Sequence, residues 1–386
     1  MTNLKDRQTG KGFSLSLSGG GFRALLFHLG VVRFLHDAGI LKQVRHIVAV
    51  SGGSILAAHM LLNWNKYIGS SDDFDEESGK IIDFVQQDVR GAVTRRAILG
   101  CGIPSTSWLL RRYLSHLYDR RTLNALGTDK KSEKSPGGSS QLVKPEIDIL
   151  ATNYTKGTLT SFSSEGVTFD RLDPDSKIFK AGHLKVDLAV AASAAYPPFF
   201  NPVKLKRRDL SLRNDDVEFD RQLFVDGGVI DNSGSRVLLK KAKSNECVPV
   251  VSDAGSEMDW NLSRFSISRG ALRAAEILMA RVADLEFEAF ERGPDGKIWL
   301  SINSPKKKKK NTDNKPTDMT EQTVKRGKDG IKGEPWMELR ELLPQVRTDL
   351  DRFSDFEVDI LVRHGYLTAK EGLKAVSYTH LTLPTN

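Results

Sequence analysis

The sequence predicts an α/β fold, a three-layer sandwich in which a mostly parallel sheet lies between helices. Short apolar strands alternate with longer helical segments along much of the 386 residues, and this alternation is typical of parallel strands joined by crossover helices. Two of these strands run directly into glycine-rich turns that open apolar helices. A chain of this length can bury a large core, so its folding requires neither a metal nor disulfides.

The N-terminal region contains two successive strand-turn-helix units. Residues 13–17 alternate apolar and polar side chains, and the turn SGGGFR separates them from a helix over 24–35. Residues 47–50 form a second buried strand, and the turn SGGS leads into another helix. Ser51 therefore lies between a strand and a helix, where we expect its hydroxyl to be exposed.

The remaining elements follow from the same patterns. An acidic stretch at 70–80 is interpreted as a loop. Further strands are predicted at 147–153, 157–162, 223–225, 248–253 and 297–302, and helices at 105–123, 188–195, 269–292, 336–353 and 355–364.

Composition divides the chain into one main domain with short additions. The segments are a polar N-terminal tail (1–12), the α/β domain (13–303) with a disordered loop near 127–141, a lysine-rich insertion (304–334), C-terminal helices packed on the domain (335–375) and a tail that is interpreted as non-native (376–386).

Charge and cysteine content exclude several classes of protein. The net charge is +8, but the insertion at 304–334 alone holds ten Lys/Arg against five Asp/Glu, and it lacks the aromatic residues of a nucleic-acid site. Cys101 and Cys247 are too few and too far apart for a zinc site or a disulfide framework. No apolar run reaches the roughly 18 residues that span a bilayer, so we expect a cytoplasmic protein.

The predicted helix at 105–123 has an apolar stripe interleaved with arginines, and Trp108 lies near its start. Two interpretations remain open. The helix packs on the domain with an arginine-rich outer face, or it is an interfacial helix that contacts anionic lipid.

Ser51 has the surroundings of a nucleophile elbow. The strained strand-to-helix turn of such an elbow requires small neighbours, and Ala49 and Gly53 satisfy this requirement. The helix N-terminus places partial positive charge beneath the hydroxyl.

The first glycine-rich turn suits an oxyanion hole. Consecutive N–H groups of Gly19, Gly20 and Gly21 form a nest at a helix N-terminus, and Arg23 adds positive potential or fixes the turn. The alternative is a dinucleotide site, because residues 19–24 also match GxGxxA. That site needs an acidic residue at the end of the second strand, where this chain has Val50-Ser51.

The serine also needs a base. Asp226 follows a predicted strand and precedes Gly227 and Gly228, which places a carboxylate on a tight turn. In the chain order of an α/β-hydrolase, the catalytic histidine follows the acid. Here the histidines after Asp226 are His364, within a predicted helix, and His380, within the tail interpreted as non-native. A Ser–Asp dyad without histidine is therefore the more economical hypothesis. A histidine-dependent esterase or lysophospholipase remains its nearest enzymatic alternative. His28 and His59 are predicted to be packed helix residues rather than catalysts.

Taken together, the turn with Arg23, the elbow at Ser51 and the DGG at Asp226 resemble the patatin-like phospholipase family. The segment 191–200 (AASAAYPPFF) resembles that family's small-residue helix and proline turn. Ala49 and Ala24 stand where the family often has glycine. The resemblance implies a phospholipase acting through a Ser51–Asp226 dyad, with an oxyanion hole at Gly19–Gly21 and Arg23 and with Gly53, Gly227 and Gly228 as supporting residues. It implies a phospholipid substrate. We further expect peripheral membrane contact and no cofactor, and from the residues themselves no metal, because no ligand cluster is visible, and no nucleic-acid partner.

Overall fold

The structure, a computed structural model, describes residues 12–87, 106–128, 143–197, 199–210, 221–245, 247–255, 267–293, 295–303 and 352–380. Most of the predicted loop near 127–141, the lysine-rich segment 304–334 and nearly all of the predicted helix at 336–353 lie outside these residues.

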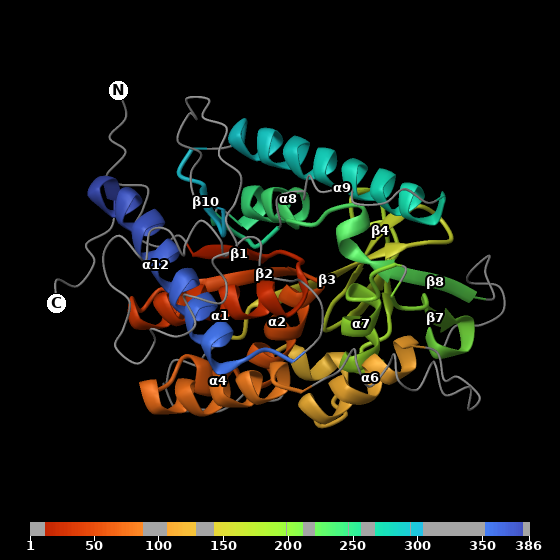
Figure 1. The fold of residues 1–386 in the computed structure, drawn as a ribbon, viewed down its shortest axis with the longest axis horizontal. Coiled ribbons are helices and arrows are strands. Elements are labelled where there is room, and N and C mark those ends of the chain that lie inside the picture. Colours follow the sequence, from red (N-terminus) through yellow and green to blue (C-terminus); the bar gives the residue numbers. More distant parts are fainter. Residues whose placement is uncertain are drawn as a thin grey trace.

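A ten-stranded mixed sheet forms the middle layer of the described chain, with the order β10-β9-β1-β2-β3-β4-β5-β6 and with β7 and β8 branching from β3 (Figure 1). The half from β10 to β3 is parallel, as the alternation of strands and helices predicts, and the other half is antiparallel. The parallel strands are β1 (Phe13–Leu17), β2 (Val44–Val50), β3 (Glu146–Asn153), β9 (Val248–Asp253) and β10 (Ile298–Ser301). The antiparallel strands are β4 (Thr158–Phe162), β5 (Gly166–Thr168), β6 (Ile178–Lys180), β7 (Val203–Lys206) and β8 (Arg221–Asp226).

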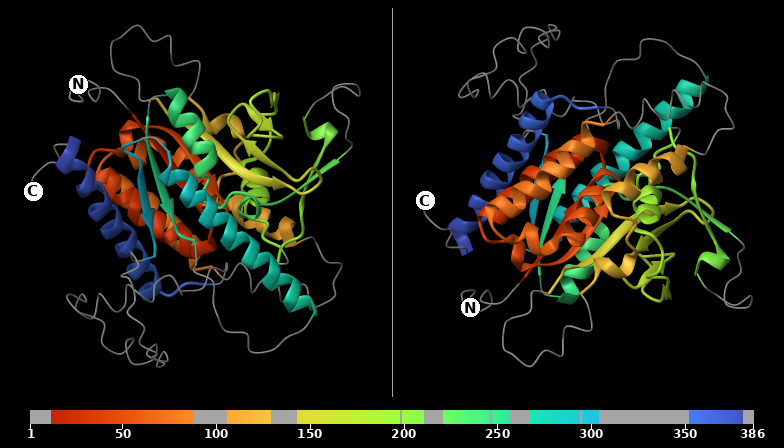
Figure 2. Two further views of the ribbon diagram at one scale, coloured as in Figure 1. Left: turned by 90° about the horizontal axis from the view of Figure 1, so that it is seen from above. Right: turned by 90° about the horizontal axis from the view of Figure 1, so that it is seen from below.

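Helices cover both faces of the parallel half (Figure 2). One layer contains α1 (Gly21–Asp37), α2 (Gly52–Leu62), α3 (Trp64–Tyr67), α4 (Ser71–Val85), α6 (Thr106–Leu117), α7 (Val186–Ser193) and α12 (Asp355–His380). The other contains α8 (Ser235–Asn245) and α9 (Ile267–Glu291). Single turns of 3-10 helix lie at Leu41–Gln43, Leu123–Leu126, Arg207–Leu210 and Gly227–Val229.

Strand β2 illustrates how the three layers are joined. Ile47 and Ala49 belong to the large core shared with α1, α2 and α12, whereas Val48 and Val50 pack with α8 in a second core. Successive side chains of a strand point to opposite faces, so a continuous apolar run such as IVAV requires cover on both sides. The three-layer prediction is confirmed.

The C-terminal helix α12 packs closely on α1. A Cβ atom added to Gly30 of α1 would lie 1.9 Å from the Val362 carbonyl oxygen, and one added to Gly365 of α12 would lie 1.9 Å from that of Phe27. Reciprocal glycines thus let the two helix backbones touch. Helix α12 continues to His380 and so includes the first five residues of the segment 376–386, which the sequence analysis interpreted as a non-native tail.

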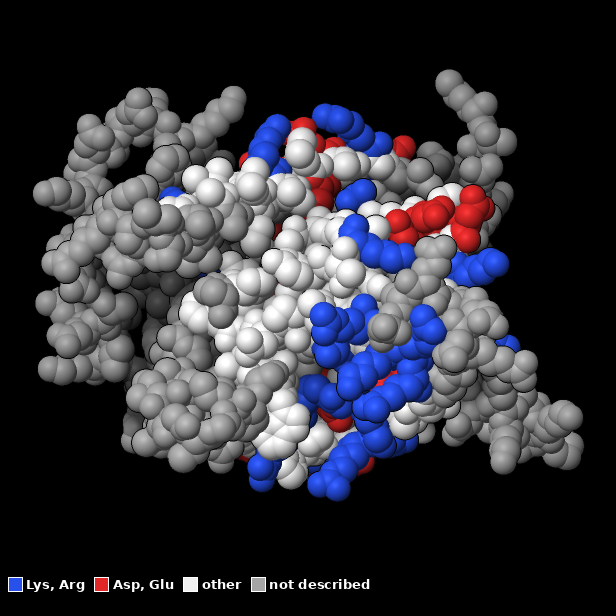
Figure 3. All heavy atoms as spheres, turned by 90° about the vertical axis from the view of Figure 1, so that its right-hand side faces the viewer, with Lys and Arg blue, Asp and Glu red and all other residues white. Residues whose placement is uncertain are grey.

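Lys and Arg side chains gather on the side of the molecule where β7 and β8 lie (Figure 3). Exposed cations on these two strands and on the turn beside them are Lys204, Arg208 and Arg221.

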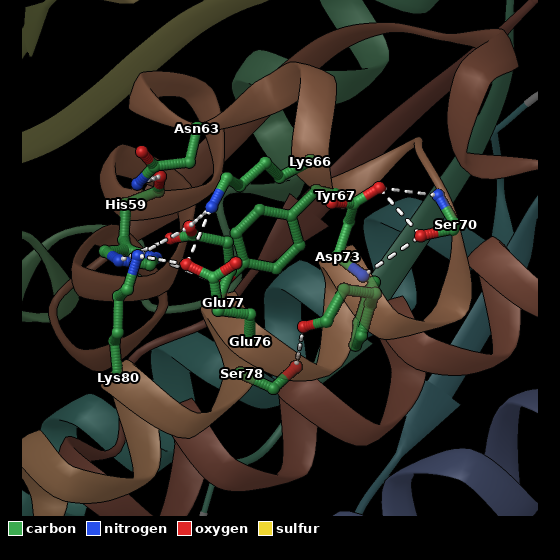
Figure 4. Close-up of polar contacts among 11 residues, drawn as sticks. His59, Asn63, Lys66, Tyr67, Ser70, Asp73, Glu76, Glu77, Ser78 and Lys80 are labelled. Atoms are coloured by element: carbon green, nitrogen blue, oxygen red, sulfur yellow. Dashed lines mark hydrogen bonds and ion pairs between the residues drawn. The ribbon is translucent and has the colours of Figure 1, made fainter.

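The stretch 70–80, expected to be a loop, belongs instead to helix α4. Ser70 and Asp73 form a capping box, in which each side chain accepts a hydrogen bond from the other residue's backbone N–H (Figure 4). Asp72, Asp75, Glu76 and Asp83 lie on the outer face, whereas Glu77 is buried together with Phe74, Ile81 and Phe84. The expectation was wrong because local acidity was given more weight than this helical spacing.

Candidate active site

The ends of β2 and β8 meet at one edge of β3. Strand β2 runs parallel to β3 as far as Val50, opposite Leu150. Strand β8 then occupies the same edge in the opposite direction and ends with Asp226 opposite Ala151. Two strands that point at each other therefore bring Ser51 and Asp226 together, although many residues separate them in the sequence.

Ser51 has the strained backbone of a nucleophile elbow. Its φ of 48° and ψ of −118° lie in a region that residues with a side chain rarely adopt. Its N–H donates to Ser193 Oγ at 2.9 Å, which ties the elbow to α7. A Cβ atom added to Gly52 would lie 2.1 Å from the Gly21 carbonyl oxygen, and one added to Gly53 would lie 2.3 Å from the Leu17 carbonyl oxygen. The turn therefore requires glycine at both positions.

Asp226 is buried beside this elbow and caps the turn Gly227–Val229, where its Oδ1 accepts the Gly228 N–H at 2.8 Å. Burial raises the pKa of Asp226 to about 6, against the lowering effects of a hydrogen bond from the Ser51 side chain and of the Gly228 N–H. Neighbouring atoms leave no room for a side chain at Gly227 or Gly228. A Cβ atom added to Gly227 would lie 2.5 Å from the Leu150 carbonyl oxygen, and one added to Gly228 would lie 2.5 Å from Asn232 Oδ1.

The glycine-rich turn at the start of α1 lies against Ser51, because a Cβ on Gly19 would come within 3.3 Å of the Ser51 Cβ. Gly20 and Gly21 have φ values of 137° and 60°, which favour glycine. The Gly19 N–H donates to the Asn232 carbonyl oxygen at 3.0 Å and is therefore engaged within the protein. Gly20 and Gly21 stand at the helix start, where N–H groups have no intrahelical acceptor.

A buried hydrogen-bond network fixes this turn. His28 Nε2 lies 3.0 Å from the Ser18 carbonyl oxygen, which can only accept, so Nε2 carries the proton and Nδ1 accepts from Ser252 Oγ at 2.7 Å. Burial lowers the pKa of His28 to about 4, which keeps the ring neutral. The Ser18 hydroxyl oxygen accepts the Ala254 N–H at 2.8 Å.

Arg23 also belongs to this supporting network. Its guanidinium donates to the Ala254 carbonyl oxygen at 2.7 Å, and its side chain is buried. Burial lowers the pKa of Arg23 to about 10, with an opposing contribution from the nearby Asp253. The group thus joins α1 to the end of β9, which corresponds to the expected role of fixing the turn.

His59 and His364 have partners other than the serine and the aspartate. His59 Nδ1 lies 3.0 Å from the Tyr67 hydroxyl, and Nε2 lies 3.5 Å from buried Glu77, on which two lysine ammonium groups also converge (Figure 4). His364 Nε2 lies 2.8 Å from the Ile302 carbonyl oxygen, in the packing of α12. The predictions of His28 and His59 as packed helix residues are confirmed.

Sequence reasoning missed Ser193 and Asn232, which contact the elbow and the glycine turn. Ser193 is one polar residue within an alanine-rich helix, and Asn232 follows the DGG segment by four positions. Their partners, Ser51 and Gly19, are distant in the sequence, so only the folded chain reveals these roles.

The part of the chain that the structure describes has neither a metal-ligand cluster nor a membrane-spanning helix. No cluster of three or more His, Cys, Asp or Glu residues there could hold a metal ion. No helix there is both long and apolar enough to cross a bilayer.

Comparisons with known proteins include two solved structures, of which the human one supports the fold. Human GIVD cytosolic phospholipase A2, in complex with methyl gamma-linolenyl fluorophosphonate inhibitor and terbium chloride, aligns with a TM-score of 0.50 and 12% identity over 96% of this chain. The alignment covers 59% of the human chain, so the present chain spans about three fifths of its length. VipD from Legionella pneumophila aligns with a TM-score of 0.39 and 15% identity, over 95% of this chain and 67% of VipD. No curated protein sequence matches the chain.

The model of the patatin-like phospholipase family matches residues 15–239, more than half of the 386 residues. This range includes the glycine-rich turn, the serine elbow and the DGG segment. Members of this family are lipid acyl hydrolases. The chain belongs to the patatin-like phospholipase family.

Proposed function

We propose that this chain is a serine acyl hydrolase that cleaves fatty-acyl esters of phospholipids, with Ser51 as the nucleophile and Asp226 as the base. The observation that carries the proposal is the meeting of a strained serine with a buried carboxylate that accepts its hydrogen bond. A base is most effective when its pKa lies near the working pH. Burial raises the pKa of Asp226 toward that pH.

In the proposed reaction, Asp226 takes the proton of the Ser51 hydroxyl while Oγ attacks the ester carbonyl carbon. The tetrahedral intermediate collapses, and the leaving alkoxide takes the proton from Asp226. Water, deprotonated by the same aspartate, then attacks the acyl-enzyme and releases the fatty acid. As the acyl–oxygen bond breaks, Ser51 Oγ takes the proton from Asp226, which restores the free serine and the ionised aspartate.

We assign the oxyanion donors to the N–H groups of Gly20 and Gly21, because the Gly19 N–H is held by Asn232. The loss of one such donor typically lowers kcat by about 10²- to 10³-fold. The backbones of the glycine turn and the elbow touch at Gly21 and Gly52. This contact favours an acyl-transfer site over a pyrophosphate-binding site, because acyl transfer needs the oxyanion donors beside the nucleophile.

Labelling with a fluorophosphonate probe tests the proposal. The wild type should react, Ser51→Ala should not, and Asp226→Asn should react far more slowly, because its carboxamide cannot accept the serine proton. Ser78→Ala is a matched control, since this buried serine of α4 bonds only locally, to the Phe74 carbonyl oxygen at 2.8 Å. Equal labelling of wild type, Ser51→Ala and Asp226→Asn would refute the dyad.

A cytoplasmic location with peripheral membrane contact belongs to the same proposal. A phospholipid substrate resides in a bilayer, so the enzyme would reach it at a lipid surface.

A further inference from the structure

The N-terminus of α6 is joined to residues 199–202, which follow α7. The Thr106 N–H and hydroxyl donate to Asn201 Oδ1 at 3.2 and 3.0 Å, and the Asn201 N–H donates to Thr106 Oγ1 at 2.8 Å. Three hydrogen bonds at one joint hold these two segments together. The residues that flank the joint are therefore close together in the fold.

Two large aromatic side chains flank this joint and remain open to solvent. Trp108 is 47% exposed on the first turn of α6, and Phe199 is 50% exposed two residues before Asn201. Tyr196 stacks on Phe199 with ring centroids 6.2 Å apart. The rest of α6 packs inward through Leu109, Leu110 and Leu114, so the exposed tryptophan is not a consequence of a loosely attached helix.

This aromatic surface adjoins the candidate active site. The Ala195 carbonyl oxygen accepts the Asp226 N–H at 3.0 Å, and Tyr196 is the next residue. The N–H groups of Phe199 and Phe200 both donate to the Tyr196 carbonyl oxygen at 3.1 Å, which makes a tight turn of the segment. One short run of chain thus connects the base to the exposed ring of Phe199.

One cation lies beside Trp108, and two more follow Phe199 along the chain. The Arg112 guanidinium lies 5.9 Å from the centre of the Trp108 ring. Lys204 and Arg208 are exposed on and beside β7, and Arg208 is 77% exposed. Lys and Arg gather visibly on the side of the molecule where β7 and β8 lie (Figure 3).

We propose that this surface, defined by Trp108, Arg112, Phe199, Lys204 and Arg208 and here named the mouth surface, docks on an anionic phospholipid bilayer. Aromatic rings favour the boundary between headgroups and acyl chains, and nearby cations are attracted to anionic headgroups. Neither feature alone selects a bilayer, but exposed rings bordered by cations fit its layered chemistry. The inference rests on the proposed acyl hydrolysis for its purpose, because docking here would bring lipid esters to Ser51.

Sedimentation with vesicles tests docking without catalysis, using the entire 386-residue chain with Ser51→Ala. Vesicles of phosphatidylcholine with phosphatidylglycerol should bind it, vesicles of phosphatidylcholine alone should bind it more weakly, and salt should reduce the difference. Adding Lys204→Gln and Arg208→Gln should weaken binding by about 25-fold, roughly fivefold for each charge. Adding Trp108→Ala and Phe199→Ala should weaken it by roughly tenfold or more for each ring.

Two control variants make the result specific. Lys42→Gln with Arg45→Gln removes two exposed cations at the start of β2, the opposite end of that strand from Ser51, and should leave binding unchanged. Leu278→Ala with Leu285→Ala removes two exposed apolar side chains from α9 and should also leave binding unchanged. Thermal unfolding midpoints equal to that of Ser51→Ala establish that each variant is folded.

Absence of binding to anionic vesicles would overturn the inference, as would equal loss in the control variants. Preferential binding of a single-stranded oligonucleotide would overturn it as well, because the cations would then serve nucleic acid. Hydrolysis of a soluble short-chain ester by the wild type reports on the proposed function separately. Failure of docking and failure of the enzyme assignment are thus distinguishable.

Discussion

Replacing Asp226 by asparagine should remove activity and at the same time stabilise the protein at neutral pH. The carboxylate is buried, and its folded-state pKa of about 6 lies above the reference value of 3.8. The folded state therefore binds the proton more tightly than the unfolded state does. Stability from this group is fully present below pH 3.8 and is lost as the pH rises through 6.

The size of the effect follows from the shift. A change of about two pKa units, at about 1.4 kcal/mol for each unit, corresponds to about 3 kcal/mol. The carboxamide of the Asp226→Asn variant would stay neutral at every pH and would still offer an oxygen to the Gly228 N–H. We therefore expect Asp226→Asn to unfold like the wild type near pH 4 and to be more stable by about 3 kcal/mol at pH 8.

Urea unfolding at a series of pH values between 4 and 8 measures the difference in the free energy of unfolding between the two proteins. This difference is the change in midpoint urea concentration multiplied by the m-value, provided that the m-value is the same for both proteins. The exposed Asp295→Asn serves as the control and should show no such pH-dependent gain. A constant difference between wild type and Asp226→Asn across the series would refute the reasoning. So would a wild type that is the more stable protein at pH 8.

Three further predictions concern the base, the elbow and helix α4. Because Asp226 must be ionised to act, kcat/KM for a soluble ester should rise through pH 6, and its value at pH 5 should be about a tenth of the plateau; a midpoint above 7 would point to a different base. Gly53→Ala should destabilise the protein by at least about 1 to 3 kcal/mol, since the methyl group meets the Leu17 carbonyl oxygen. Gly79→Ala, where the interior of α4 leaves open space, should stabilise it by up to about 1 kcal/mol; chemical denaturation of the two variants checks both signs.

Much of the fold could be predicted from local sequence. The strand at 13–17, the run IVAV and the helix following each glycine turn all follow from periodicity and turn chemistry, because these signals extend over a few neighbouring residues. Helix α4 was missed although its capping box is also local. The exposed Asp72, Asp75 and Glu76 make the stretch polar on average, although Phe74 and Ile81 mark a buried face.

The candidate site divides in the same way. Ser51, Asp226 and the three glycines carry local signatures of tight turns and were predicted. The engagement of the Gly19 N–H by Asn232 was not, because it depends on a contact between residues distant in sequence. The antiparallel approach of β8 to the edge of β3 likewise depends on the pairing of strands that the chain order does not specify.

The reciprocal glycine contact between α1 and α12 affects the order in which the parts of the chain can fold during synthesis. Helix α1 begins at the glycine turn beside Ser51, yet its outer surface is covered by a helix synthesised hundreds of residues later. On the ribosome, Ser51 and Asp226 emerge well before that cover exists. The apolar side of α1 then remains exposed, so the nascent chain depends on chaperones or on late collapse until α12 arrives.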